Sequence, residues 1–72
     1  MNNYQEIVDC SAEKIDFIIS QYVHKKTDRE ILRLKWLDEI TYREIAEITG
    51  MSIRGVQYVV SRNRKKLLKY FL

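Results

Sequence analysis

The sequence predicts a small all-α domain of four helices, and three observations lead to this fold class. The chain of 72 residues contains no proline and only two glycines, so few positions interrupt a helix. Apolar residues recur at intervals of three and four, which is the spacing of one face of a helix. No segment bounded by turn residues alternates apolar and polar residues, as a half-buried strand would.

Length and composition limit the class of protein. A chain of this size forms one domain with a modest core. The single cysteine, Cys10, can form no internal disulfide, which is typical of a reducing compartment. No apolar run approaches the roughly 20 residues that cross a bilayer, and the acidic N-terminus differs from the basic start of a signal peptide. We therefore expect a cytoplasmic protein from which no segment is removed.

The first helix is predicted within residues 1–26, and the other three within residues 27–72. Five apolar residues follow the pattern i, i+3, i+4, i+7, i+8, and they are Ile15, Ile18, Ile19, Tyr22 and Val23. Ile7 and Val8 either extend this helix or form a separate turn before Ser11. Three basic residues at 24–26 suit the C-terminal end of a helix.

The second helix is predicted to begin near Asp28, because Thr27 and Glu30 form a capping-box pattern. It is expected to end around Asp38, because residues 38–40 lead directly to Thr41, the N-cap expected for the next helix. Its apolar residues are Ile31, Leu32, Leu34, Trp36 and Leu37. We expect Trp36 to lie in the core, since a tryptophan is usually the largest packing element of a small helical domain.

The third and fourth helices are predicted to form a helix-turn-helix. Thr41 and Glu44 form a second capping box, which starts a helix at Tyr42–Thr49 that ends at Gly50. We expect Ile45, Ala46 and Ile48 on its inner side. Ser52 is a good N-cap for a fourth helix from Ile53 to about Leu68 or beyond. Its inner face is expected to hold Ile53, Val56, Val60, Asn63 and Leu67. A short helix, a glycine-containing turn and a longer basic helix are typical of the unit that places its second helix in a DNA major groove.

Charge is distributed unevenly along the chain. Residues 52–72 contain six basic and no acidic residues, whereas residues 1–51 contain seven basic and ten acidic residues. This asymmetry indicates phosphate binding by the fourth helix. The alternative is a solvated basic helix end, because cations also suit the C-terminal end of the helix dipole.

The candidate binding residues lie mainly on the outer face of the fourth helix. Four residues are predicted to reach base edges, namely Arg54, Gln57, Tyr58 and Ser61. Arginine pairs with guanine and glutamine with adenine, whereas tyrosine and serine reach a thymine methyl group or a phosphate. Phosphate contacts are predicted for Arg43, Ser52, Arg62, Arg64, Lys65 and Lys66. Two alternatives remain: Gln57 and Tyr58 belong simply to an exposed surface, and Arg43 pairs with Glu47.

Nothing in the sequence indicates catalysis or a cofactor. His24 has no cysteine or second histidine near it, so a metal site is not expected. Cys10 has no histidine partner for nucleophilic catalysis. A glycine-rich phosphate loop is also missing from the sequence. We therefore expect a binding protein and no enzyme.

Several of these motifs together resemble region 4 of bacterial sigma-70-type factors, especially those of the extracytoplasmic-function type. The similarity covers residues 27–68 and rests on Arg29, Ile31, Leu32, Leu34, Tyr42-Arg43-Glu44-Ile45-Ala46, Gly50-Met51-Ser52, Val56 and Ser61-Arg62-Asn63-Arg64-Lys65-Lys66-Leu67. In that family the second helix of the motif reads the promoter −35 element, and the domain also contacts the flap of RNA polymerase. The resemblance implies DNA recognition by Arg54, Gln57, Tyr58 and Ser61, with phosphate contacts from Arg43 and Arg62.

The chain departs from that family at two positions and in length. Gly55 stands where threonine or serine is usual, and Asn63 where alanine is usual. A chain of this length has no room for the region that opens the promoter, so we expect a free-standing regulator of the kind found in phages and mobile elements, or an excised fragment. The motif is also similar to LuxR-type DNA-binding domains, which act as dimers. A homodimer here would use the first helix and the apolar tail, residues 67–72.

Three classes of function remain from the sequence. The leading one is a sequence-specific DNA-binding transcriptional regulator. The second is a module that docks on RNA polymerase or a sigma factor through Leu68, Tyr70, Phe71 and Leu72, with weak DNA binding or none. Salt dependence separates the two, because only phosphate binding weakens steeply with salt. An RNA-binding protein is disfavoured, since no exposed aromatic platform is evident.

Overall fold

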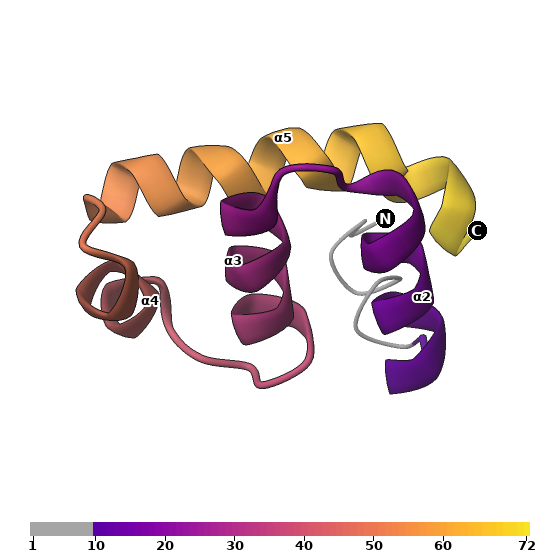
Figure 1. Ribbon diagram of the computed structural model, residues 1–72, viewed down its shortest axis with the longest axis horizontal. Helices are drawn as coiled ribbons and strands as arrows, with labels where there is room; N and C mark the ends of the chain where they lie inside the picture. The colour runs from indigo at the N-terminus through magenta and orange to yellow at the C-terminus, as the bar shows by residue number, and fades with distance from the viewer. Residues whose placement is uncertain (1–9) are drawn as a thin grey trace.

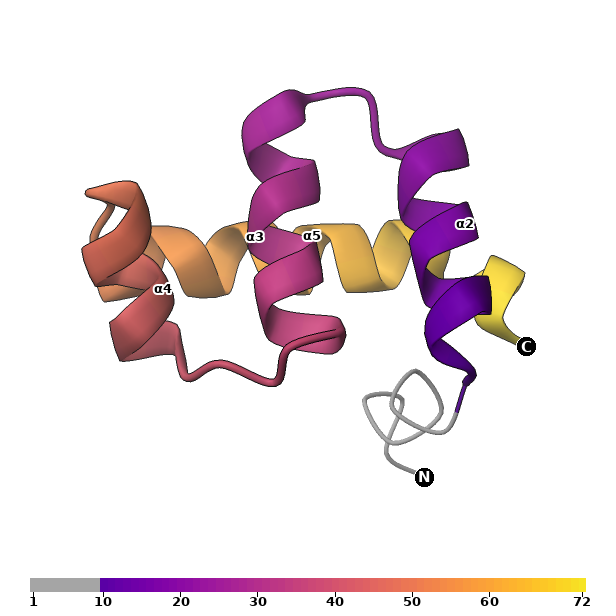
Figure 2. The ribbon, with the colours of Figure 1, turned by 60° about the horizontal axis from the view of Figure 1, so that its bottom comes forward.

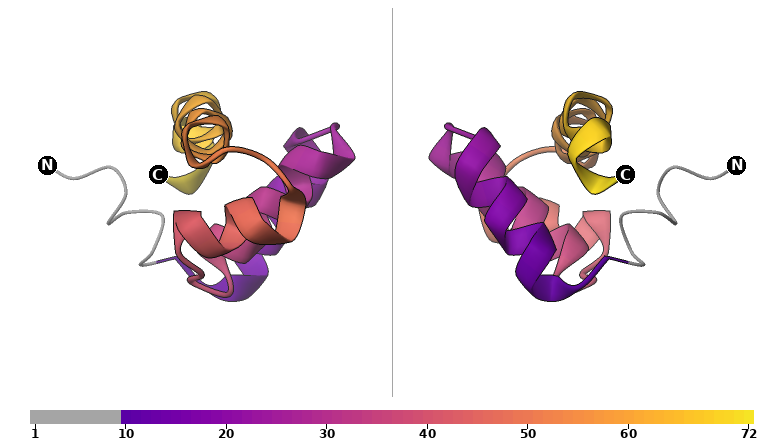
Figure 3. Two further views of the ribbon diagram at one scale, coloured as in Figure 1. Left: turned by 90° about the vertical axis from the view of Figure 1, so that its left-hand side faces the viewer. Right: turned by 90° about the vertical axis from the view of Figure 1, so that its right-hand side faces the viewer.

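The computed structural model describes residues 10–72, which form four α-helices and no strand. The predicted all-α fold is therefore confirmed, while the alternatives for Ile7 and Val8 fall outside the described residues. The helices are α2 (Ala12–Tyr22), α3 (Lys26–Trp36), α4 (Tyr42–Thr49) and α5 (Ile53–Phe71). Helices α2, α3 and α4 lie side by side with α3 in the middle, and α5 crosses all three (Figures 1 and 2). Viewed along its axis, α5 lies on one side of this layer (Figure 3).

Helix α2 carries the predicted apolar stripe. Ser11 is its N-cap, and the Ser11 hydroxyl accepts a hydrogen bond from the backbone N–H of Lys14 at 3.1 Å. Three residues of the stripe are buried within the helix, namely Ile15, Ile18 and Ile19. Val23 is buried as well, but it is the extended C-cap and lies after the last helical residue.

Helix α3 begins at Lys26, earlier than predicted, and the capping box of Thr27 and Glu30 is wrong. Lys25 is the N-cap, and its side chain makes no capping hydrogen bond. Arg29 holds the preceding chain instead, because its Nη1 donates to the carbonyl oxygens of Val23 and His24 at 3.1 and 2.8 Å. The N-terminal end of α3 is therefore held by the contacts of Arg29 with the preceding backbone and not by a side-chain N-cap. The helix ends at Trp36, before the predicted Asp38.

The helix-turn-helix follows the prediction closely in its backbone. The Thr41 hydroxyl accepts from the backbone N–H of Glu44 at 3.2 Å, and α4 has the predicted bounds. Gly50 has a φ of 76°, the left-handed conformation that glycine adopts at little cost. The Ser52 hydroxyl accepts from the backbone N–H of Gly55 at 3.0 Å. Helix α5 continues to Phe71, which agrees with the predicted end at about Leu68 or beyond.

The inner faces of α4 and α5 differ from the prediction at three positions. Ile48 is 62% exposed, because α4 buries the side that carries Ile45 and Ala46. Ile53 is 41% exposed at the rim of a hollow at the turn between the two helices. Val59 is buried although it was not expected to be, since α5 crosses three helices and buries a broader face than one stripe.

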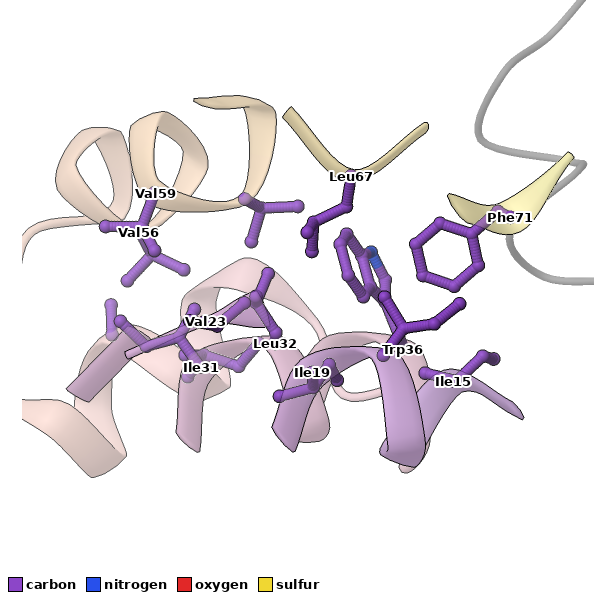
Figure 4. Packing of buried hydrophobic residues seen from close by; sticks show 14 residues of the cluster. Ile15, Ile19, Val23, Ile31, Leu32, Trp36, Val56, Val59, Leu67 and Phe71 are labelled. Atoms are coloured by element: carbon purple, nitrogen blue, oxygen red, sulfur yellow. The ribbon is translucent and has the colours of Figure 1, made fainter. Parts of the chain in front are cut away.

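The apolar tail packs on its own domain. The ring of Tyr70 stacks on that of Tyr22 in α2, with centroids 3.8 Å apart. Phe71 is buried and meets Trp36 edge to face at 5.7 Å. Figure 4 shows the indole of Trp36 beside Leu67 and Phe71, which confirms the core position expected for the tryptophan. The structure therefore shows the tail attached to α2 and α3 of its own domain.

Replacement of Gly50 by alanine is expected to lower the free energy of unfolding by about 1 kcal/mol. An added Cβ would meet no atom within 4 Å, so the cost comes from the left-handed backbone alone. Gly55→Ala is the matched control, because Gly55 is helical and alanine favours a helix. Its Cβ would lie 3.1 Å from the Ser52 hydroxyl oxygen, and this close contact offsets the gain in helix propensity. The free energy of unfolding of Gly55→Ala should therefore change little. Urea unfolding followed by circular dichroism measures both, and an equal loss in the two variants would contradict the prediction.

Candidate nucleic-acid interface

The predicted base-contacting residues lie on the side of α5 that faces away from the other helices. Arg54, Gln57 and Tyr58 are exposed, and Ser61 is half-buried. Arg54, Tyr58 and Ser61 share one stripe, since they are spaced by four and three residues, and Gln57 lies beside it. The structure thus presents the four side chains together along the N-terminal half of α5, the helix that Figure 1 shows across the top of the domain.

Tyr58 is the exposed aromatic residue of this surface. This residue is 63% exposed, and the Arg62 guanidinium lies 5.5 Å from the centroid of its ring. The two side chains line a shallow hollow together with Ser61, Lys65 and Lys66. A ring beside a cation, at a hollow lined by further cations, is suited to contacts with sugars, phosphates and thymine methyl groups.

Arg62 is anchored by an acidic residue that the sequence analysis missed. Arg62 Nη2 donates to Asp28 Oδ2 at 2.5 Å, and Asp28 is only 5% exposed. Asn63 Nδ2 donates to the same carboxylate oxygen at 3.3 Å and to the carbonyl oxygen of Val59 at 2.9 Å. The polar Asn63 on an apolar face was the signal in the sequence, because a buried amide needs partners. One of its two partners, Asp28, lies 35 positions away in the chain.

The predicted phosphate-contacting residues lie in two regions, the turn between α4 and α5 and the C-terminal half of α5. Arg43 and Ser52 line the hollow at the turn between α4 and α5. Arg62 and Lys66 lie on the side of α5 that faces the segment between α2 and α3. Lys65 is exposed on the outer stripe, and Arg64 is half-buried. Within residues 10–72, Arg43 forms no ion pair with Glu47.

Residues 10–72 contain no group of three or more side chains that could hold a metal ion. None of the described helices combines the length and apolar character needed to cross a membrane. The Cys10 sulfur lies 3.7 Å from the carbonyl oxygen of Phe71, at the end of α5.

Comparison with known proteins gave one match. The family model described as "Sigma-70, region 4" matches residues 25–67. The match spans α3, α4 and α5 as far as Leu67, and leaves α2 and the last turn of α5 outside. Neither the curated proteins nor the solved structures gave a match.

Proposed function

The chain belongs to the sigma-70 region 4 family, and from this premise we propose that it is a sequence-specific DNA-binding transcriptional regulator. Membership supports a helix-turn-helix with a role at DNA or RNA polymerase. The observation that carries the narrower proposal is the exposed basic face of α5. Residues 52–72 hold six basic and no acidic side chains, and the described neighbours bury only the opposite face of the helix. We also propose that the chain forms one domain and that the protein is cytoplasmic.

In the proposed complex, the N-terminal half of α5 lies in the major groove. The first residues of such a helix contact base edges, which assigns that role to Arg54 and Gln57. Tyr58 and Ser61 follow one turn later and reach thymine methyl groups or phosphates. Farther along α5, the cations Arg62, Arg64, Lys65 and Lys66 contact the phosphate backbone, and Arg43 and Ser52 do so at the turn.

The alternative is docking on RNA polymerase or a sigma factor with little DNA binding. The tail offers less surface for it than the sequence suggested, because Phe71 is buried and Tyr70 is stacked on Tyr22. The same packing limits a homodimer, which would depend on exposed residues such as Phe17 of α2 and Leu72. These observations favour DNA as the partner of α5.

Binding to duplex DNA at several salt concentrations tests the proposal. We expect the wild-type protein to bind a random duplex pool and its affinity to fall steeply with salt. Lys65→Ala should weaken binding to all sequences about equally and reduce the slope of log affinity against log salt by about 0.9. Lys14→Ala is the charge-matched control on α2, away from the outer face of α5, and should leave the slope unchanged. Absence of wild-type binding at low salt would refute the proposal and favour docking.

Arg54→Ala should change sequence preference as well as affinity. A bidentate arginine–guanine contact contributes about 1–3 kcal/mol of discrimination against the wrong base. Sequences selected from a random pool by the wild-type and variant proteins should therefore differ. The variant should lose the base preference at one or two adjacent base pairs. An unchanged selected sequence would exclude Arg54 from base reading.

A further inference from the structure

A hollow lies between α5 and the segment that joins α2 to α3, farther along α5 than the turn of the helix-turn-helix. This segment, residues 23–25, is called the connector below. The hollow measures about 380 Å³ and is lined by Val23, His24, Lys25, Asp28, Arg62, Asn63 and Lys66. Three of these residues belong to no helix and were not among the predicted contacts, namely Val23, His24 and Lys25.

The charge that lines this hollow is positive. Lys25, Arg62 and Lys66 each carry a positive charge, and all three are exposed. The one acidic residue of the lining, Asp28, is buried beneath them and accepts hydrogen bonds from Arg62 and Asn63. With His24 neutral, the lining has a net charge of about +2, which suits an anion.

The backbone around the hollow is held in place. Arg29 donates from Nη1 to two carbonyl oxygens of the connector, those of Val23 and His24. Lys25 therefore extends from a fixed position. On the other side, Arg62 and Lys66 are four residues apart on α5, so they lie one above the other on the same edge of the helix.

Asp28 directs Arg62 toward this hollow. The ion pair uses Nη2, whereas a guanidinium carries five N–H donors in a planar fork. The Arg62 side chain remains 49% exposed, so it can donate to a second anion while Asp28 holds it. An arginine fixed in this way loses less side-chain entropy when it binds a phosphate than a free one does.

We propose that this hollow binds a phosphate of the DNA backbone, with Lys25, Arg62 and Lys66 as contacts and Asp28 as the positioning residue for Arg62. The proposal rests on the DNA-binding function, because the backbone strands run along both edges of a helix that occupies the major groove. Arg62 and Lys66 mark one edge of α5, and the connector extends that edge outward. The DNA footprint then includes an element outside the helix-turn-helix.

The first test compares two neighbouring lysines. Lys25 lines the hollow, whereas Lys26 is exposed, carries the same charge and does not line it. Lys25→Gln should reduce the slope of log affinity against log salt by about 0.9, and Lys26→Gln should reduce it by far less. Equal slopes for the two variants would overturn the proposed site, although the function of α5 would stand. A wild-type protein that binds no DNA would instead refute the function itself.

The second test asks whether replacement of Asp28 raises or lowers the affinity for DNA. Removal of a negative charge near DNA tightens binding if only the net charge matters. The proposal predicts the reverse for Asp28→Asn, a weaker affinity and a smaller salt slope, because Arg62 is no longer held. Glu30→Gln is the matched control, since Glu30 is exposed on the same helix, and its affinity should rise or stay unchanged.

Circular dichroism must show that Asp28→Asn is folded at the assay temperature, because partial unfolding would lower the apparent affinity by itself. A loss of folded protein alone leaves the salt slope unchanged, so the slope separates this cause from a lost phosphate contact. A folded Asp28→Asn variant that binds as tightly as Glu30→Gln would overturn the role of Asp28. If that variant does not fold, the lysine comparison decides the site, because both lysines are exposed.

Discussion

Replacement of Trp36 by alanine is expected to lower the free energy of unfolding by about 4 kcal/mol. Trp36 is 5% exposed and contacts Phe71 of α5 edge to face, so the indole joins α3 to the C-terminal end of the crossing helix. A domain of this size has a stability on the order of 5 kcal/mol, and the variant should therefore be largely unfolded. Urea unfolding followed by far-ultraviolet circular dichroism is the suitable measurement, because Trp36 is the only tryptophan and its fluorescence is lost.

Trp36→Phe is the control for this prediction. The indole Nε1 is buried without an acceptor among residues 10–72, and an unpaired buried donor costs about 1–3 kcal/mol. Phenylalanine removes that donor and keeps most of the ring packing, so we expect a loss under about 1.5 kcal/mol. A Trp36→Ala variant that unfolds cooperatively with an equally small loss would show that the contact with Phe71 is dispensable.

Replacement of Arg62 by alanine is expected to lower the free energy of unfolding by about 2 kcal/mol, apart from any effect on DNA binding. The variant leaves the carboxylate of Asp28 buried, with Asn63 as its remaining side-chain donor. The loss is smaller than for a fully buried pair, because Arg62 itself is half exposed. Thermal or urea unfolding measures it, and Lys65→Ala is the control, since Lys65 is exposed and should change stability by less than about 0.5 kcal/mol.

A double-mutant cycle identifies the cause of this loss. In an Asp28→Asn background no charge remains to be neutralised, so Arg62→Ala should cost less than about 1 kcal/mol. The same cost in both backgrounds would mean that Arg62 stabilises the domain through other contacts. Since Arg62 contributes to folding as well, Lys65 is the better position for measuring phosphate binding by α5.

The candidate site could be predicted in part. The outward stripe of Arg54, Tyr58 and Ser61 follows from helical periodicity, because the apolar positions between them define the opposite face. Asp28 and the connector could not be found in this way. From the sequence, Asp28 is predicted to lie at the start of a helix, where exposed acidic residues are common. No feature of the neighbouring sequence indicates that Asp28 is buried.

Local signals in the chain are sufficient for the helices and for the turn of the helix-turn-helix. The caps of Thr41 and Ser52 bond to groups three residues away, and Gly50 needs only its own conformational freedom, so each can be recognised from a short stretch of sequence. The tertiary structure alone decides which of the predicted inner residues are covered, and it leaves Ile48 exposed and buries Val59. It also decides that Asp28 meets Arg62, 34 positions along the chain. The reason is physical: these contacts arise where α5 crosses the other helices, and the position of that crossing depends on the whole core.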